Sequence, residues 1–173
     1  MSAPAGRSNR PNGIPPLRLL ALMALICVAA FARASSEDEV AALVARATPP
    51  EGVVFEIVSW DGDALEWAVP AVRRYTERLR KRFPRLSVAV VTHGNEMFSL
   101  RAEERGARAP MHAEARNLVR SDGVPLHVCG TYAEMRGIDP EAFPGYVDVA
   151  PSGPAQVRAY QTLGYTLVRV TRN

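Results

Sequence analysis

The sequence predicts an α/β fold of the flavodoxin-like type, a three-layer sandwich with a mainly parallel five-stranded sheet. Two observations support this class. Short segments rich in β-branched residues alternate with longer helical segments, which is the pattern of right-handed crossover units. In addition, segment 86–92, "LSVAVVT", is almost continuously apolar. A strand has this composition when helices cover both faces of its sheet.

Residues 1–34 have the pattern of a secretory signal peptide. The opening contains no acid and three arginines: Arg7, Arg10 and Arg18. An apolar run over 19–31 follows, and it is too short to span a bilayer, which takes about 20 residues. Ala-Arg-Ala at 32–34 is an A-x-A cleavage pattern. We expect cleavage before Ser35, a periplasmic or secreted protein, and no stable membrane span after cleavage. The alternative is an uncleaved amphipathic anchor.

The net charge depends on this leader. The whole chain has 21 basic and 18 acidic residues and a formal charge of +3. The leader contains four arginines and no acid, so 17 basic and 18 acidic residues remain, with a formal charge of −1. A nucleic-acid-binding surface needs a clustered excess of Lys and Arg. The basic run 73–83, "RRYTERLRKRF", predicts a solvated helix face with Glu77 interleaved. No nucleic-acid partner is therefore expected.

The domain organisation follows from composition and length. Residues 35–50 begin with an acidic run, show helical periodicity and end at two prolines, so they predict an N-terminal arm or a short helix. No linker or repeat divides the residues that follow, and we expect a single α/β domain over 51–173. Removing 34 of the 173 residues leaves 139, about the size of one domain with a full core.

The first half of the domain alternates strand and helix. Segment 53–59, "VVFEIVS", is rich in branched and aromatic residues and predicts a strand. The sequence Asp-Gly-Asp at 61–63 has turn and helix-capping chemistry, so a helix is expected over 64–82. Pro70 lies in or near its first turns, where a missing N–H group costs least. The apolar strand 86–92 comes next.

The second half contains shorter elements. Residues 95–110 carry many charges without periodicity and predict a loop or a short helix. A helix is expected over 111–121, with His112 solvated. Gly, Pro and Ser then mark the boundaries. The predicted elements are a strand over 125–129, a helix over 132–136 with Gly137 as C-cap, a strand within 146–153, a helix over 154–163 between Ser152 and Gly164, and a strand over 165–170.

Cys129 remains when the leader, which contains Cys27, is set aside. A secreted domain that needed disulfides would have an even and denser set. Cys129 lies where a strand passes to a helix, and the carboxyl ends of parallel strands are where chemistry collects. Gly130 permits close backbone approach, and the N–H groups from Thr131 onward would favour a thiolate. These residues alone leave open whether Cys129 is a reactive thiol or a small buried hydrophobe.

Three further polar residues are expected near Cys129. His127 lies two residues earlier in the same strand, so its side chain should share a face with the thiol and could serve as base or charge partner. His93 and Glu96 follow strand 86–92 at the same edge of the sheet. These residues could form one polar pocket with Cys129. Each histidine could instead be packed and hydrogen-bonded near a strand end.

Other motif readings have less support. The chain has no C-x-x-C and no phosphate-binding G-x-x-x-x-G-K-[ST]. Imidazole and thiolate would suit copper or zinc at His93, His127 and Cys129. Spacing alone is weak support for such a site, and we expect neither a metal nor a cofactor. A Cys-His hydrolase is poorly supported because no oxyanion arrangement can be placed.

The chain from Val53 to Val170 resembles the DsrE/DsrF-like proteins, which include the DsrE and TusD subunits of bacterial sulfur relays. Three segments carry the resemblance: "VVTHGNE", "DGVPLHVCGTYAEMRGI" and "APSGPAQVRAYQTLGYTLVRV". The second contains a strand, Cys129, a short helix and Arg136-Gly137. The third contains a Pro-Ser-Gly cap, a helix and a Gly-aromatic turn into the final strand.

The resemblance implies a function as well as a fold. It implies a homo-oligomer, a trimer or a hexamer, whose Cys129 takes up sulfane sulfur as a persulfide and passes it from a sulfur donor to an acceptor. Such a protein would be a sulfur carrier or sulfurtransferase. Arg136 would pair with an anionic sulfur species or complement a helix C-terminus. The relay subunits are cytoplasmic, whereas this leader predicts export, so their donors and acceptors do not carry over. The alternative is a non-enzymatic module that binds a small ligand or metal, or serves in assembly, while Cys129 is only packed.

Overall fold

Five parallel strands form one sheet in a computed structural model that describes residues 35–172. The leader expected over 1–34 lies outside the described residues. The strand order is β4-β3-β2-β1-β5. The strands are β1 (Gly52–Ile57), β2 (Ser87–Thr92), β3 (Leu126–Cys129), β4 (Asp148–Ala150) and β5 (Tyr165–Arg169).

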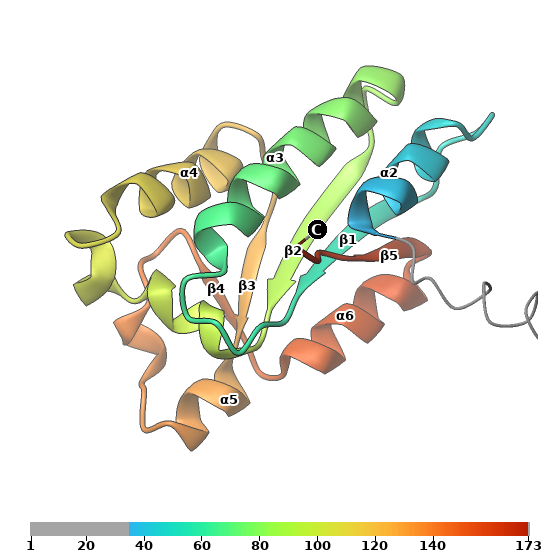
Figure 1. The fold of residues 1–173 in the computed structure, drawn as a ribbon. Helices are drawn as coiled ribbons and strands as arrows, with labels where there is room; N and C mark the ends of the chain where they lie inside the picture. Colours follow the sequence, from blue (N-terminus) through green and yellow to red (C-terminus); the bar gives the residue numbers. More distant parts are fainter. Residues whose placement is uncertain (1–34, 173) are drawn as a thin grey trace, which may run out of the picture. The chain divides into compact units, whose positions relative to one another are not determined.

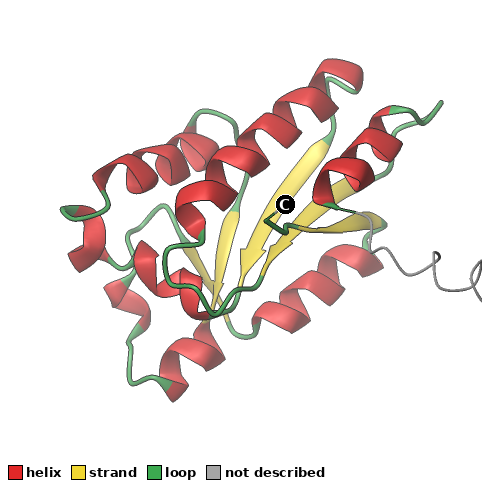
Figure 2. Ribbon diagram, viewed as in Figure 1, coloured by secondary structure: helices red, strands yellow, loops and turns green. Residues whose placement is uncertain are grey.

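Helices cover both faces of this sheet (Figure 1, Figure 2). The helices α2, α3 and α4 lie on one face and α6 lies on the other, while the short α5 follows β3 at the carboxyl edge of the sheet. The predicted flavodoxin-like sandwich is therefore confirmed, and every strand pair is parallel. The α-helices are α2 (Ser36–Val44), α3 (Leu65–Arg82), α4 (Ala109–Arg120), α5 (Gly130–Met135) and α6 (Gly153–Thr162). The described residues also contain the 3₁₀ helices η2 (Asn95–Leu100), η3 (Ala102–Arg105) and η4 (Pro140–Ala142).

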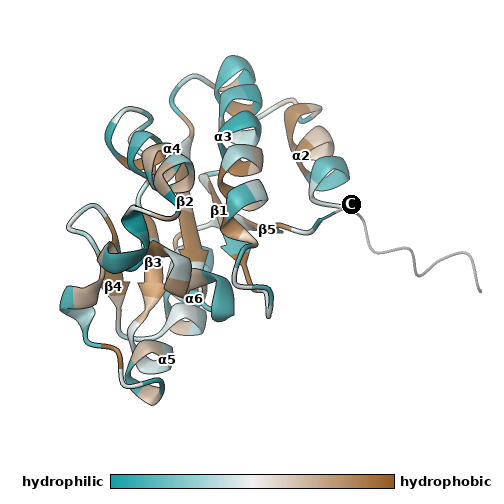
Figure 3. Ribbon diagram, turned by 60° about the vertical axis from the view of Figure 1, so that its left-hand side comes forward, coloured by the Kyte–Doolittle hydropathy of each residue, from teal (hydrophilic) through white to brown (hydrophobic). Residues whose placement is uncertain are grey.

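The two faces of the sheet differ in how much apolar surface they bury. Side chains alternate along β1, so Val53 and Phe55 pack in the large core beneath α2, α3 and α4, whereas Val54 faces α6. The α6 side has only a small buried cluster, which is Val54, Ala89, Val91 and Val157. In Figure 3 the strands are largely brown, the colour of hydrophobic residues, because their side chains contribute to the cores on both faces of the sheet. Because α6 is one helix on a five-stranded sheet, its face leaves room for polar side chains near the carboxyl ends of the strands.

The start of α2 is fixed by a capping box. The Ser35 hydroxyl accepts from the Asp38 backbone N–H at 3.2 Å, and the Asp38 carboxylate accepts from Ser35 N at 3.1 Å. Val40 and Leu43 bury the inner face of the helix. The segment expected to be an arm or a short helix thus folds as α2. None of the helices in residues 35–172 is long and apolar enough to cross a membrane.

Helix α4 departs from the prediction in two ways. It begins at Ala109, because Pro110 fits the first turn, where no intrahelical N–H bond is needed. The expectation that His112 is solvated is wrong, since His112 is 3% exposed. Its Nε2 lies 3.0 Å from the Ser99 carbonyl oxygen and its Nδ1 lies 2.6 Å from the Tyr146 hydroxyl. Both ring nitrogens therefore have partners, which makes burial of the imidazole tolerable.

Candidate functional site

His93 and Cys129 meet at the carboxyl edge of the sheet. In the parallel pairing of β2 with β3, Thr92 lies opposite Val128. The following residues, His93 and Cys129, therefore lie opposite each other, and neighbouring strands are about 4.8 Å apart. The first residue of α6 lies against both. A Cβ atom on Gly153 would lie 2.5 Å from the His93 Cβ and 3.2 Å from the Cys129 Cβ. Only glycine lets α6 begin this close to the two side chains.

Cys129 is the N-cap of α5 as well as the last residue of β3. Its Sγ accepts a hydrogen bond from the Tyr132 backbone N–H at 3.4 Å, and such a bond is stronger for an ionised acceptor than for a neutral one. The residue is 5% exposed. Thr131 anchors the first turn of α5, since its N–H and hydroxyl donate to the Pro151 carbonyl at 3.0 and 2.6 Å. A Cβ on Gly130 would lie 3.0 Å from the Ala150 carbonyl oxygen, so this backbone approach is also close.

An ion-pair chain runs from β5 to His93. The Arg169 Nε donates to Glu56 Oε2 at 2.9 Å, and Glu56 Oε1 lies 3.0 Å from His93 Nε2. Only 12% of the Glu56 side chain and 14% of the His93 side chain are exposed. The hydrogen bond from His93 is the main cause that lowers the pKa of Glu56, and the Arg169 guanidinium lowers it further, against the opposing effect of burial.

The charge on Glu56 determines the role of each His93 nitrogen. A carboxylate only accepts hydrogen bonds, so Nε2 carries the proton, and Nδ1 holds the lone pair in neutral imidazole. Within residues 35–172, no hydrogen bond engages Nδ1. A base at this position could take a proton from a thiol or from a bound sulfur compound at the edge of Cys129.

His127 makes different contacts from those of His93. Its Nε2 lies 2.8 Å from the Tyr160 hydroxyl on α6, and its Nδ1 lies 3.8 Å from Asp148 Oδ2. Burial lowers the pKa of His127, and the Asp148 charge opposes this only in part. No hydrogen bond joins His127 to Cys129 in the described chain. The imidazole therefore lies beneath α6 with a partner of its own.

Glu96 and Arg136 also have contacts of their own, and in the described chain neither forms a hydrogen bond with the thiol. Glu96 is fully buried, and its carboxylate accepts from three groups at the ends of β1 and β2: Ser59 N at 2.7 Å, Thr92 Oγ1 at 2.6 Å and Gly94 N at 2.9 Å. The Glu96 carboxylate thus links the segment that follows β1 to the segment that follows β2. The exposed Arg136 guanidinium lies over the Phe98 and Tyr132 rings, 5.7 and 6.0 Å from their centroids.

Sequence reasoning missed three residues of this site: Glu56, Gly153 and Arg169. Glu56 gave the clearest signal, because it is a carboxylate inside the apolar segment "VVFEI". Such a residue usually has a buried partner. The copper or zinc alternative finds no support in the described residues, where no group of three or more His, Cys, Asp and Glu side chains is placed to hold a metal ion.

Comparison with known proteins identifies the family. The model of the DsrE/DsrF-like family matches residues 73–170, which cover more than half of the chain and include Cys129. The chain belongs to the DsrE/DsrF-like family. A protein of unknown function from Methanobacterium thermoautotrophicum, MTH1491, has a similar structure, with a TM-score of 0.53 and 24% sequence identity. The alignment covers 68% of this DsrE/DsrF-like chain and 96% of MTH1491, and at this identity it shows the fold alone. No curated protein matches the chain significantly.

Proposed function

We propose that this DsrE/DsrF-like protein is a sulfur-relay protein that carries sulfane sulfur as a persulfide on Cys129. The observation that supports this most is the placement of the single thiol of the described chain beside a histidine that a buried carboxylate orients. Glu56 lies near the end of β1, His93 directly follows β2 and Cys129 ends β3, so the three residues reach the same edge of the sheet. A nucleophile, a base and a group that orients the base are the parts that thiol catalysis requires.

The proposed reaction is a sulfur exchange without net oxidation. His93 Nδ1 takes the proton from the Cys129 thiol, and the thiolate attacks the outer sulfur of a donor persulfide, R–S–SH. The new S–S bond forms on Cys129 while the donor S–S bond breaks, and its electron pair leaves on R–S⁻. The imidazolium then protonates R–S⁻, so the products are Cys129–S–SH and R–SH. The same exchange with an acceptor thiol regenerates Cys129.

Export and assembly complete the proposal. The leader pattern supports release into the periplasm or outside the cell, and Ser35, the first residue after the expected cleavage, is already the N-cap of α2. An intact mass that still contained residues 1–34 would contradict export with cleavage.

The proposal also includes assembly. Formation of a homo-oligomer, a trimer or hexamer, or contact with donor and acceptor proteins would cover the exposed apolar side chains of Trp60 (85%) and Met135 (75%).

The alternative function has one observation in its favour, the low exposure of Cys129. A packed cysteine would belong to a small-ligand or metal-binding or assembly module. Alkylation kinetics separate the two functions. A carrier thiol should react with iodoacetamide in native buffer at neutral pH, with Cys129→Ser as the unreactive control. Reaction that begins only in denaturant would contradict the carrier and support the packed cysteine.

A further inference from the structure

A cavity of about 450 Å³ lies between α4 and the segment 144–146 that leads into β4, away from Cys129. The polar groups that line it are mainly guanidinium groups, from Arg105, Arg116 and Arg120. Of its lining residues in the described chain, none is acidic. We call this cavity the arginine groove. An adjoining cavity of about 380 Å³ shares Arg120 and Tyr146 with it and contains Asp148 at its border.

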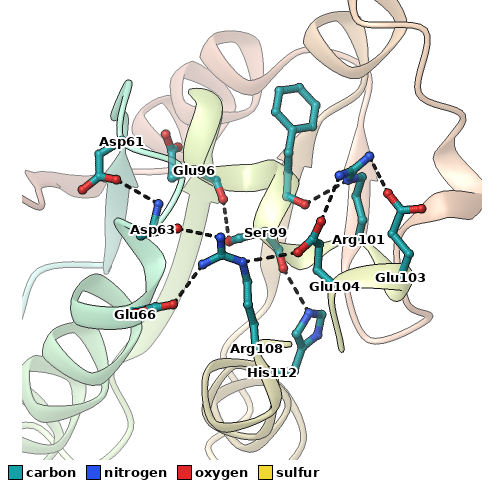
Figure 4. Close-up of polar contacts among 11 residues, drawn as sticks. Asp61, Asp63, Glu66, Glu96, Ser99, Arg101, Glu103, Glu104, Arg108 and His112 are labelled. Atoms are coloured by element: carbon teal, nitrogen blue, oxygen red, sulfur yellow. Dashed lines mark hydrogen bonds and ion pairs between the residues drawn. The ribbon is translucent and has the colours of Figure 1, made fainter. Parts of the chain in front are cut away.

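Two acids close to the arginine groove are engaged with other arginines, whereas Asp148, beside the adjoining cavity, lies 3.8 Å from His127 Nδ1. Figure 4 shows Glu104 between Arg101 and Arg108, with ion pairs of 3.1 and 3.5 Å. Glu114, the acid within α4, pairs with Arg73 on α3 at 2.5 Å. In the part of the chain that the structure describes, no ion pair engages any arginine of the groove. The positive charge of these three arginines is therefore not neutralised by an ion pair within the described chain and can attract an anionic solute.

The arginines come from two segments, Arg105 from η3 and Arg116 and Arg120 from α4, and all three line the same cavity beside Tyr146. Burial raises the pKa of the Tyr146 phenol, and the charges of Arg105 and Arg116 both oppose that rise. Arg116 and Arg120 are four residues apart on α4, a spacing at which like charges repel and destabilise a helix. A bound anion would offset this repulsion. The small residues Ala109 and Ala113 leave the space between the guanidinium groups open.

The base of the groove is held by hydrogen bonds. The Ser99 carbonyl can only accept, so His112 Nε2–H donates to it (Figure 4). The Tyr146 hydroxyl then donates to His112 Nδ1. Burial lowers the pKa of His112, which keeps the imidazole neutral and this direction of bonding intact. The Tyr146 ring is thereby fixed as one wall between the guanidinium groups.

We propose that the arginine groove binds a small molecule that carries two or more oxyanion groups, phosphate or carboxylate. Guanidinium groups match these oxygens as two-donor forks, and three of them around one cavity favour a polyanion over a single anion. The cavity has the size of a small-molecule site. This site is separate from the proposed sulfur chemistry and does not depend on it.

Isothermal titration of the purified protein in 150 mM NaCl tests the proposal, with pyrophosphate and citrate as probes. We expect saturable 1:1 binding of at least one probe, with a Kd of about 1 mM or tighter. Preference for pyrophosphate would identify a phosphate ligand, and preference for citrate would identify a carboxylate ligand. The variant Arg105→Gln/Arg116→Gln/Arg120→Gln should weaken binding by about 30-fold or more, because it removes the charge-assisted bonds.

A matched variant removes the same charge elsewhere. Arg74→Gln/Arg85→Gln/Arg158→Gln changes three exposed arginines outside the groove and should keep the affinity within about threefold of the wild type. A single Arg116→Lys change, which keeps the charge and the fold, should weaken binding measurably because lysine lacks the fork. Absence of saturation at about 10 mM with both probes, or equal losses in the two triple variants, would overturn the proposal.

Discussion

The Nε2 atom of His93 lies 3.0 Å from Oε1 of Glu56, and both side chains are largely buried. This pair joins two adjacent parallel strands at the edge where Cys129 ends a third. The Arg169 guanidinium donates to the other carboxylate oxygen at 2.9 Å, so both oxygens of Glu56 have a hydrogen-bond partner. A carboxylate that is fixed in this way orients the imidazole, and in the described chain it leaves Nδ1 without a hydrogen bond. The predicted behaviour of Cys129 depends on this orientation.

Glu56→Gln should slow alkylation of Cys129 about tenfold at pH 7, because an uncharged amide orients and stabilises the imidazole less well than a carboxylate. Iodoacetamide kinetics over pH 5 to pH 9 would measure the change and the accompanying shift of the pH profile. Glu77→Gln alters an exposed acid on α3 and should leave the rate unchanged. Identical profiles for Glu56→Gln and the wild type would contradict a role of the pair at the thiol.

Gly153→Ala should disturb the site through contact rather than charge. Its new Cβ would lie 2.5 Å from the His93 Cβ. His93 directly follows β2, and its backbone N–H donates to the Ile57 carbonyl at 3.2 Å, so it cannot move easily and α6 must shift. We expect a loss of about 1 to 3 kcal/mol in the free energy of unfolding, measured in urea. Gly106→Ala is the matched control, since a Cβ there meets nothing within 4 Å and its φ of −70° suits alanine. Equal stability of the two variants would show that the close approach is not required.

Acid should weaken the fold below about pH 6.5. Burial lowers the pKa of His112 and of His127 from 6.5, so the unfolded chain binds protons more readily than the native chain as the pH falls. Their contribution is complete above pH 6.5 and is lost as the pH falls through the native pKa values. Urea unfolding at pH 7.5 and 5.5 should show a loss of about 1 to 2 kcal/mol. Equal stability at the two values would contradict buried, neutral histidines.

The sequence predicts much of the fold because local signals and global topology agree. The run "LSVAVVT" is apolar on both faces of β2, and Gly137 and Gly164 have φ values of +67° and +85° where helices were expected to end. Ser152 caps α6 as its position predicts. Each of these features depends on residues that are close together in the sequence, so local sequence patterns are sufficient to predict it.

The site is less predictable because its pairings depend on strand register. Glu56 and His93 are 37 residues apart, and only the parallel pairing of β1 with β2 brings them together. Alternation along a strand predicts that His127 shares a face with Cys129, but it does not reveal that His127 Nε2 lies 2.8 Å from the Tyr160 hydroxyl on α6. His112 shows the same limit, since its partners Ser99 and Tyr146 are 13 and 34 residues away along the chain.

Intact mass spectrometry after incubation with polysulfide tests the proposed persulfide most directly. The protein should gain about 32 Da, the mass of one sulfur atom, and lose it again with a thiol reductant. Cys129→Ser should gain nothing, and Glu56→Gln should gain the same mass more slowly. A native wild-type protein that gains no sulfur, while its denatured form does, would contradict the account and leave Cys129 as a packed residue of the core.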